Sequence, residues 1–204
     1  MQTRTFSGLE TLLAFLIGFA IAMFVHSYLV PRSVTERNAV PLIESVAVFD
    51  ARGVVSIGLP TRLRIPKIGV NSVIEYMGLT VDGAMDTPTS PDRVGWFALG
   101  THPGNVGNAV MAGHYGWKNG IPAVFDNLNT LRKGDLLYVD DEKGVTVIFV
   151  VRESRTYDQA DGASEVFLSS NGGSHLNLIT CQGVWNKDMK SYSHRLVIFT
   201  DKKE

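Results

Sequence analysis

From Thr61 onward the sequence is divided into short segments rich in β-branched and aromatic residues, with turn residues between them. The clearest segments are 61–66, 108–114, 135–140, 145–157, 176–181 and 195–201. Short apolar segments separated by Gly, Pro, Asn and Asp are typical of an all-β sandwich or barrel. Residues 61–204 are therefore expected to form one mostly β domain, which is large enough to bury a core without disulfides.

Three connections within this domain can be predicted. The polar cluster 140–144 ends in glycine, which predicts a hairpin that pairs its flanking strands antiparallel. Both alternating faces of 145–151 are apolar, so this strand is expected to be covered on both sides. Residues 122–131 are the best helical candidate, because Phe125, Leu128 and Leu131 recur every third position after Pro122.

The N-terminal part of the chain predicts a membrane anchor. Residues 11–30 contain no Asp, Glu, Lys or Arg, and at about 1.5 Å per residue a helix of this length spans the ~30 Å core of a bilayer. Residues 1–10 are then a cytoplasmic N-terminus, 11–30 a transmembrane signal anchor, 31–60 an extracellular tether and 61–204 the exported domain. The alternative is a signal peptide cleaved after Ala22, but the apolar run continues through Val25, which favours a retained anchor.

Composition excludes several kinds of partner. Nineteen Lys and Arg against 20 Asp and Glu give a formal net charge of -1, so the chain lacks the basic field that attracts nucleic acid. Its one cysteine excludes an intrachain disulfide, and scattered histidines do not suggest a metal cluster.

That cysteine, Cys181, follows a segment that resembles a buried strand. A lone cysteine is more often an inert, buried residue, but it becomes a nucleophile where a cation favours the thiolate and a histidine can carry protons. His114 is the best-placed histidine, because it ends an apolar strand between Gly113 and Gly116. The alternative is a turn histidine bonded to a backbone carbonyl.

Arg195 begins the segment after Cys181. If segments 176–181 and 195–201 pair antiparallel, Arg195 lies beside Cys181, and the loop 182–194 rises over both. An arginine in this position could stabilise an oxyanion. The alternatives are a solvated arginine at a strand edge, or Arg152 in its place, although Arg152 lies in mid-strand.

Four motifs then carry a resemblance: "AVMAGHYGW", "VFDNLNTLRKGDLLYV", "LNLITCQG" and "RLVIFT". In this order and at this spacing they resemble the sortase family of transpeptidases, over roughly residues 63–200. Residues 94–114 are most similar to the class F branch. Where many relatives have an acidic or polar residue soon after the histidine, this chain has Tyr115, Gly116 and Trp117. The resemblance implies an all-β fold, a closed sortase-type β-barrel of about eight strands with short helices.

The resemblance also implies an activity and its residues. Cys181, His114 and Arg195 fall on the catalytic positions of the family, and Thr180 is expected to orient the site. The Cys181 thiolate attacks the Thr–Gly carbonyl of an LPxTG-like sorting signal on a secreted protein and forms a thioester. An amine of a cell-wall precursor or a pilin then takes the acyl group. No metal or organic cofactor is required.

Two other functions remain possible on the sequence. An exported L,D-transpeptidase would also be β-rich, but its cysteine typically follows an S-x-G motif that "NLITCQG" lacks, and a papain-type peptidase would place cysteine before histidine. A non-catalytic, membrane-tethered binding domain would bury Cys181 and keep His114 and Arg195 far from it.

Together, the apolar segment 11–30 and the resemblance of the β domain predict a single-pass protein of the cell membrane with its catalytic domain outside the cytoplasm.

Overall fold

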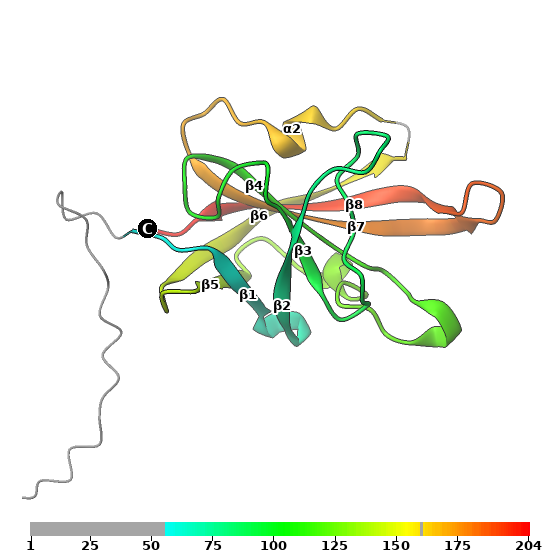
Figure 1. Ribbon diagram of the computed structural model, residues 1–204, viewed down its shortest axis with the longest axis horizontal. Coiled ribbons are helices and arrows are strands. Elements are labelled where there is room, and N and C mark those ends of the chain that lie inside the picture. The colour runs from blue at the N-terminus through cyan, green and yellow to red at the C-terminus, as the bar shows by residue number, and fades with distance from the viewer. Residues whose placement is uncertain (1–55, 160) are drawn as a thin grey trace, which may run out of the picture. The chain divides into compact units, whose positions relative to one another are not determined.

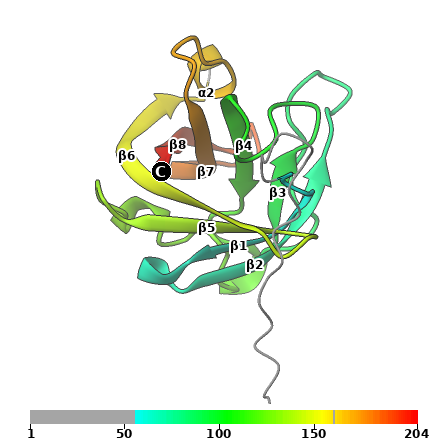
Figure 2. The same cartoon turned by 90° about the vertical axis from the view of Figure 1, so that its left-hand side faces the viewer.

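The computed structural model describes residues 56–159 and 161–204, and within them eight strands close into one barrel (Figures 1 and 2). The strands follow each other around the barrel in the order β1-β2-β3-β4-β7-β8-β6-β5. Their bounds are β1 Pro60–Ile65, β2 Val70–Met77, β3 Val94–Phe97, β4 Gly107–Gly113, β5 Leu136–Asp141, β6 Thr146–Asp158, β7 Ser174–Asn186 and β8 Ser191–Lys202. The described helices are short: the α-helix α2 (Ser164–Phe167) and the 3-10 helices η1 (Pro66–Ile68), η2 (Lys118–Gly120) and η3 (Leu128–Thr130). The expected all-β barrel of eight strands with short helices is confirmed.

Two strand pairs are parallel, β2 with β3 and β4 with β7, and the other six pairs around the barrel are antiparallel. The predicted hairpin at 140–144 joins β5 to β6, with Asp140 opposite Thr146. The parallel pair β4–β7 joins segments more than sixty residues apart. This long-range pair brings the middle of the chain beside its C-terminal part.

The wall formed by β4, β7 and β8 is buried on both faces. Leu196 and Ile198 of β8 point into the barrel, whereas Val197 and Phe199 pack outside it against Val166 of α2. Figure 1 shows α2 lying over this wall. Each fully buried side chain of this size contributes roughly 1.5–3 kcal/mol of transfer free energy. The wall is therefore a rigid support for residues on its outer face.

β6 is covered less completely than its sequence predicts. Val147, Phe149 and Val151 are buried in the barrel, but Ile148 and Val150 on the other face are only half-buried. The expectation that both faces would be covered is therefore correct for one face only, because α2 packs over the neighbouring strands.

The predicted helix over 122–131 is wrong. Only Leu128–Thr130 is helical, as one 3-10 turn, and residues 124–127 before it form turns. The Asp126 carboxylate accepts hydrogen bonds from the backbone N–H groups of Gly116 and Ala123, at 2.7 and 2.9 Å, which stabilises the turns. Phe125 and Leu128 are still fully buried, because a spacing of three also suits the three-residue turn of a 3-10 helix.

The predicted anchor, 11–30, lies outside the described residues, as does most of the tether, 31–60. Among residues 56–159 and 161–204, no helix combines the length and the apolar character needed to cross a bilayer. The first described strand, β1, starts at Pro60.

Candidate active site

Cys181 and Arg195 lie beside each other on the outer face of the barrel. They are direct partners in the antiparallel ladder of β7 and β8, as the sequence predicts. Their neighbours Thr180 and Leu196 are 3 % and 5 % exposed, so these side chains point inward. Since side chains alternate along a strand, Cys181 and Arg195 both face outward.

His114 reaches the same place through the parallel pairing of β4 with β7. The last pair of this ladder is Ala112 with Ile179. One residue further, the Thr180 hydroxyl donates a 2.8 Å hydrogen bond to the carbonyl of Gly113, with a separation of 67 positions. The same offset aligns His114 with Cys181. His114, directly after the end of β4, is therefore in line with Cys181 of β7 and Arg195 of β8, and Thr180 ties β7 to β4.

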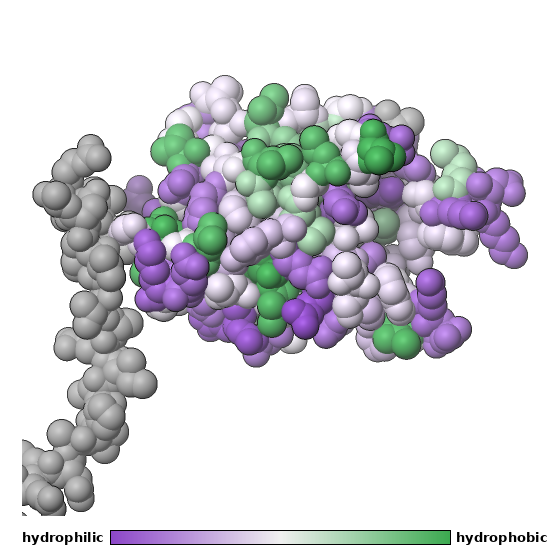
Figure 3. Space-filling model, in the orientation of Figure 1, coloured by the Kyte–Doolittle hydropathy of each residue, from purple (hydrophilic) through white to green (hydrophobic). Residues whose placement is uncertain are grey.

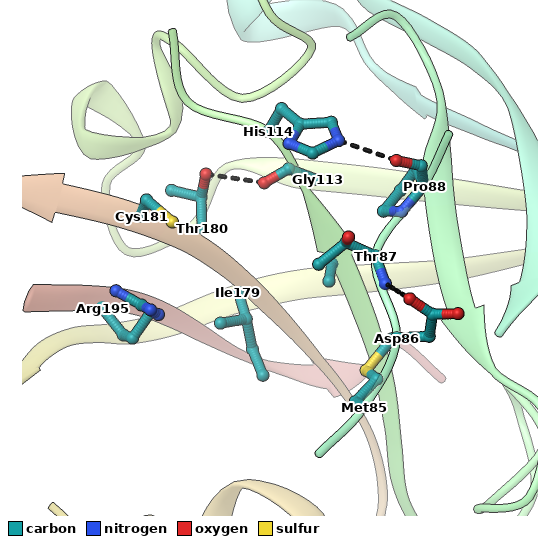
Figure 4. A pocket seen from close by; sticks show the side chains of 11 residues that line it. Met85, Asp86, Thr87, Pro88, Gly113, His114, Ile179, Thr180, Cys181 and Arg195 are labelled. Atoms are coloured by element: carbon teal, nitrogen blue, oxygen red, sulfur yellow. Dashed lines mark hydrogen bonds between the residues drawn. The ribbon is translucent and has the colours of Figure 1, made fainter. Parts of the chain in front are cut away.

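A pocket of about 150 Å³ lies among these three side chains (Figure 4). We call it the Met85 pocket, because the segment 85–88 forms the wall opposite Cys181 and Arg195. Ala112 and Ile179 add to its mostly apolar lining. The row of three polar groups thus borders a small, apolar space in which water competes poorly for their hydrogen bonds.

The His114 ring is held by its surroundings. Its Nε2 is 2.8 Å from the carbonyl oxygen of Pro88 and donates to it, and the ring packs edge-on against Trp117 with centroids 4.5 Å apart. Figure 4 shows the Nε2 edge turned toward Pro88, away from Cys181. A side chain at the preceding Gly113 would overlap the ring of Phe125, which explains the glycine there. In this tautomer Nδ1 is left free to accept a proton.

The Arg195 guanidinium is fixed by its own strand. Its Nη1 donates to the carbonyls of Tyr192 and His194, each at 3.0 Å, and its Nη2 donates to the hydroxyl of Ser191 at 2.9 Å. A guanidinium has five N–H donors. The Nε–H and the second Nη2–H have no hydrogen-bond partner among the described residues, so they remain available to a bound molecule.

The Cys181 thiol is half-buried, and this burial raises its pKa above the usual value. The positive charge of Arg195 acts in the opposite direction, but burial is the larger effect. The neutral thiol therefore predominates at neutral pH, and a nearby base is needed to form the thiolate.

A second pocket, of about 490 Å³, also borders Cys181 and His114, and we call it the aromatic pocket. Its remaining walls are Tyr115, Gly116, Trp117, Lys118, Trp185, Lys190, Ser191 and Tyr192. The predicted loop over 182–194 is wrong: β7 and β8 continue as a two-stranded ribbon with Trp185 opposite Tyr192 (Figure 1). Most of the expected loop is thus part of β7 and β8, and only the residues between Asn186 and Ser191 form the turn that joins them.

A third cavity, of about 570 Å³, adjoins the Met85 pocket beneath α2, and we call it the α2 groove. Met85, Ile179 and Arg195 line both spaces, so the two lie next to each other. Phe167 and Val197 contribute apolar lining, and Figure 3 shows apolar side chains gathered at the surface near α2. An extended, partly apolar chain could therefore run from α2 to Cys181.

The three other histidines of the described residues, His102, His175 and His194, line neither of the two pockets beside Cys181, and neither does Arg152. His175 and Arg152 both contact the Asp201 carboxylate, at 2.8 and 2.6 Å. His194 lies 3.1 Å from Asp158. In the described ranges, no three His, Cys, Asp or Glu side chains are grouped so that they could hold a metal ion.

Two groups of pocket residues were missed by the sequence reasoning. The 85–88 segment has no motif of its own and is brought to the site by long-range packing. Trp185 and Tyr192 could have been found, because a hairpin with its turn at 187–190 places them opposite each other.

Comparisons with known proteins agree with this geometry. Residues 63–203 match the family model described as the sortase domain. A crystal structure of sortase C-1 from Actinomyces oris aligns with a TM-score of 0.56 and 27 % identity, over 71 % of this chain and 73 % of that one. The pilus island 1 sortase C2 of Group B Streptococcus aligns at 0.52 and 26 %, over 71 % and 73 %. Sortase A from Corynebacterium diphtheriae aligns at 0.55 and 21 %, over 74 % and 63 %, which supports the fold alone. No curated protein matches the chain.

Proposed function

This chain belongs to the sortase family, and from that premise we propose that it cleaves an LPxTG-like sorting signal between Thr and Gly and transfers the acyl group to an amine. The family makes it a cysteine transpeptidase of the sortase type. The substrate, the acceptor from a cell-wall precursor or a pilin, the class F assignment and the classification as a hydrolase are parts of the proposal. The observation that carries it is the row of His114, Cys181 and Arg195 around one pocket.

The proposed acylation step uses all three side chains. The Cys181 sulfur attacks the Thr carbonyl carbon, and the two unpaired donors of Arg195 stabilise the oxyanion. His114 takes the thiol proton and gives it to the departing glycine amine. The raised pKa of Cys181 is consistent with this order of steps, because burial favours the neutral thiol over the thiolate.

The acyl part of the substrate is assigned to the Met85 pocket and the α2 groove. A signal that begins with Leu and Pro is apolar, as are Met85, Ile179 and Phe167 along this path. Arg195 lies where the two spaces meet, so the scissile carbonyl would reach Cys181 from the α2 side.

The two alternative functions make different demands on the site. A non-catalytic binding domain needs no common pocket for Cys181, His114 and Arg195, yet they share one. An L,D-transpeptidase is disfavoured by the match of residues 63–203 to the sortase domain.

We also propose that residues 11–30 anchor the chain in the cell membrane and hold the β domain outside the cytoplasm. An anchor would keep enzyme, secreted substrate and lipid-linked acceptor in one thin layer, which raises their effective concentrations. Resistance of the native protein to alkaline extraction from membranes, and digestion of the β domain by external protease, would support this topology. Full release by alkali would contradict it.

The test of activity uses the full-length chain, a fluorogenic library of LPxTG-like peptides and candidate amines. Wild type should release the glycine fragment and accumulate a thioester on Cys181 that mass spectrometry detects. Cys181→Ala should lose both, and Arg62→Gln, a matched arginine change on β1 away from the site, should retain them. Peptide cleavage by Cys181→Ala at the wild-type rate would refute the assignment of the nucleophile.

A further inference from the structure

We propose that the aromatic pocket is the acceptor site and that it selects an amine whose molecule also carries a carboxylate. This inference rests on the proposed function, because an acceptor acts only on a thioester. It goes further by naming the chemical class of the acceptor and the residues that select it.

The position of the aromatic pocket supports the first part. Cys181 and His114 are the two residues that it shares with the Met85 pocket. An acyl chain that occupies the Met85 pocket therefore leaves the aromatic pocket open on the other side of the thioester. A molecule bound there can present its amine to the thioester carbonyl and to His114 at once.

The walls of the pocket suit an aliphatic or peptide chain. Tyr192 meets Tyr115 edge-on at a centroid distance of 5.5 Å and Trp185 at 5.2 Å. Burial raises the pKa of Tyr192, and the nearby Tyr115 and Cys181 raise it further, so its hydroxyl stays protonated and can donate to a ligand. Trp185 is 49 % exposed, so a large part of its apolar ring is accessible at the mouth of the pocket.

The charges of the pocket support the carboxylate. Lys118 and Lys190 both line it, and no Asp or Glu does. Neither ammonium has an ion-pair partner within the part of the chain that the structure describes. The nearby Asp126 already accepts two backbone hydrogen bonds. Two unpaired cations repel a diamine and attract a molecule with a carboxylate at a distance from its amine.

The transfer step balances without a further reactant. The amine nitrogen forms a bond to the thioester carbonyl carbon, and the bond from carbon to the Cys181 sulfur breaks. The amine proton passes to His114, which returns it to the sulfur. The products are an amide and the free thiol.

The first experiment compares glycylglycine with glycylglycinamide, which share the amine but differ in the carboxylate. With the full-length chain and a peptide that it cleaves, the ratio of transfer to hydrolysis should be roughly five-fold higher with glycylglycine than with glycylglycinamide. This is the effect expected of two partly exposed ion pairs. The variant with both Lys118→Gln and Lys190→Gln should lose this preference. Lys187→Gln is the matched control, because Lys187 lies in the same hairpin as Lys190 but does not line the pocket. It should keep the preference.

The second experiment measures binding without catalysis. In full-length Cys181→Ala, glycylglycine should change the fluorescence of Trp117 and Trp185 at lower concentration than glycylglycinamide does, and the double lysine variant should remove this difference. O-phosphoethanolamine carries a phosphate in place of the carboxylate, and its binding at lower concentration than glycylglycine would overturn the selection of a carboxylate.

The outcomes separate the two proposals. Carboxylate-dependent binding without cleavage of any peptide would refute the proposed function and leave the selectivity of the pocket standing. Cleavage with equal use of the two acceptors, or equal effects of Lys187→Gln and the double variant, would overturn the acceptor inference and leave the proposed function standing.

Discussion

The two sides of Cys181 are built differently. On one side, the Met85 pocket and the α2 groove are apolar spaces formed by the barrel wall, α2 and the segment 85–88. On the other side, the aromatic pocket is formed by the segment 114–118 after β4 together with the ribbon of β7 and β8, and each of these two parts carries one lysine. The difference suggests that one side recognises its ligand by shape and the other by aromatic contact and charge.

Loss of a group common to both sides should have the largest effect. His114 lines both pockets, so His114→Ala is expected to lower acylation and aminolysis together by roughly 10²- to 10⁴-fold, the usual contribution of a general acid–base group. Single-turnover measurements of thioester formation and of its aminolysis check this. A loss confined to one of the two steps would show that His114 serves only one side.

The support beneath both pockets can be weakened through Thr180. Thr180→Val removes the hydrogen bond to the Gly113 carbonyl, which should lower the free energy of unfolding by about 0.5–1.5 kcal/mol. Urea denaturation of the β domain measures this. Thr156→Val, which removes an exposed hydrogen bond to Gln182, is the control and should cost less than about 0.5 kcal/mol. Equal losses in the two variants would show that the bond between β4 and β7 has no special role.

A change on the acyl side alone should leave the acceptor side intact. Met85→Ala removes apolar surface shared by the Met85 pocket and the α2 groove, so the KM for peptide should rise by roughly five- to ten-fold, with the acceptor constant unchanged. Steady-state kinetics with both substrates varied provides the test. Met189→Ala, at a residue that is 63 % exposed in the hairpin, should change neither constant.

The smallest effect is expected in the pH dependence of Cys181 itself. Its raised pKa means that alkylation by iodoacetamide should stay slow through neutral pH and accelerate only as the pH rises through the raised value. Arg195→Gln removes the charge that lowers this pKa, so the midpoint should move to still higher pH. A midpoint below the usual thiol range would indicate that Arg195 outweighs burial.

Local patterns were sufficient for much of the fold. Short apolar segments and turn residues predicted the strands β1 and β4 to β8, and the hairpin at 140–144 followed from its composition. The pairing of Cys181 with Arg195 could also be anticipated, since antiparallel neighbours joined by one turn have few possible registers. The helix expected over 122–131 failed because Asp126 stabilises turns through backbone contacts that no periodicity records.

The sequence by itself determined which residues could react and which segments could be strands, because residue chemistry and side-chain alternation are local properties. Only the tertiary structure decided that His114 stands beside Cys181, that Pro88 holds its ring, and that Cys181 lies between two unlike pockets. These relations depend on closing the barrel. The parallel pairing of β4 with β7 joins residues 67 positions apart, and its register follows from how the whole core packs rather than from either segment.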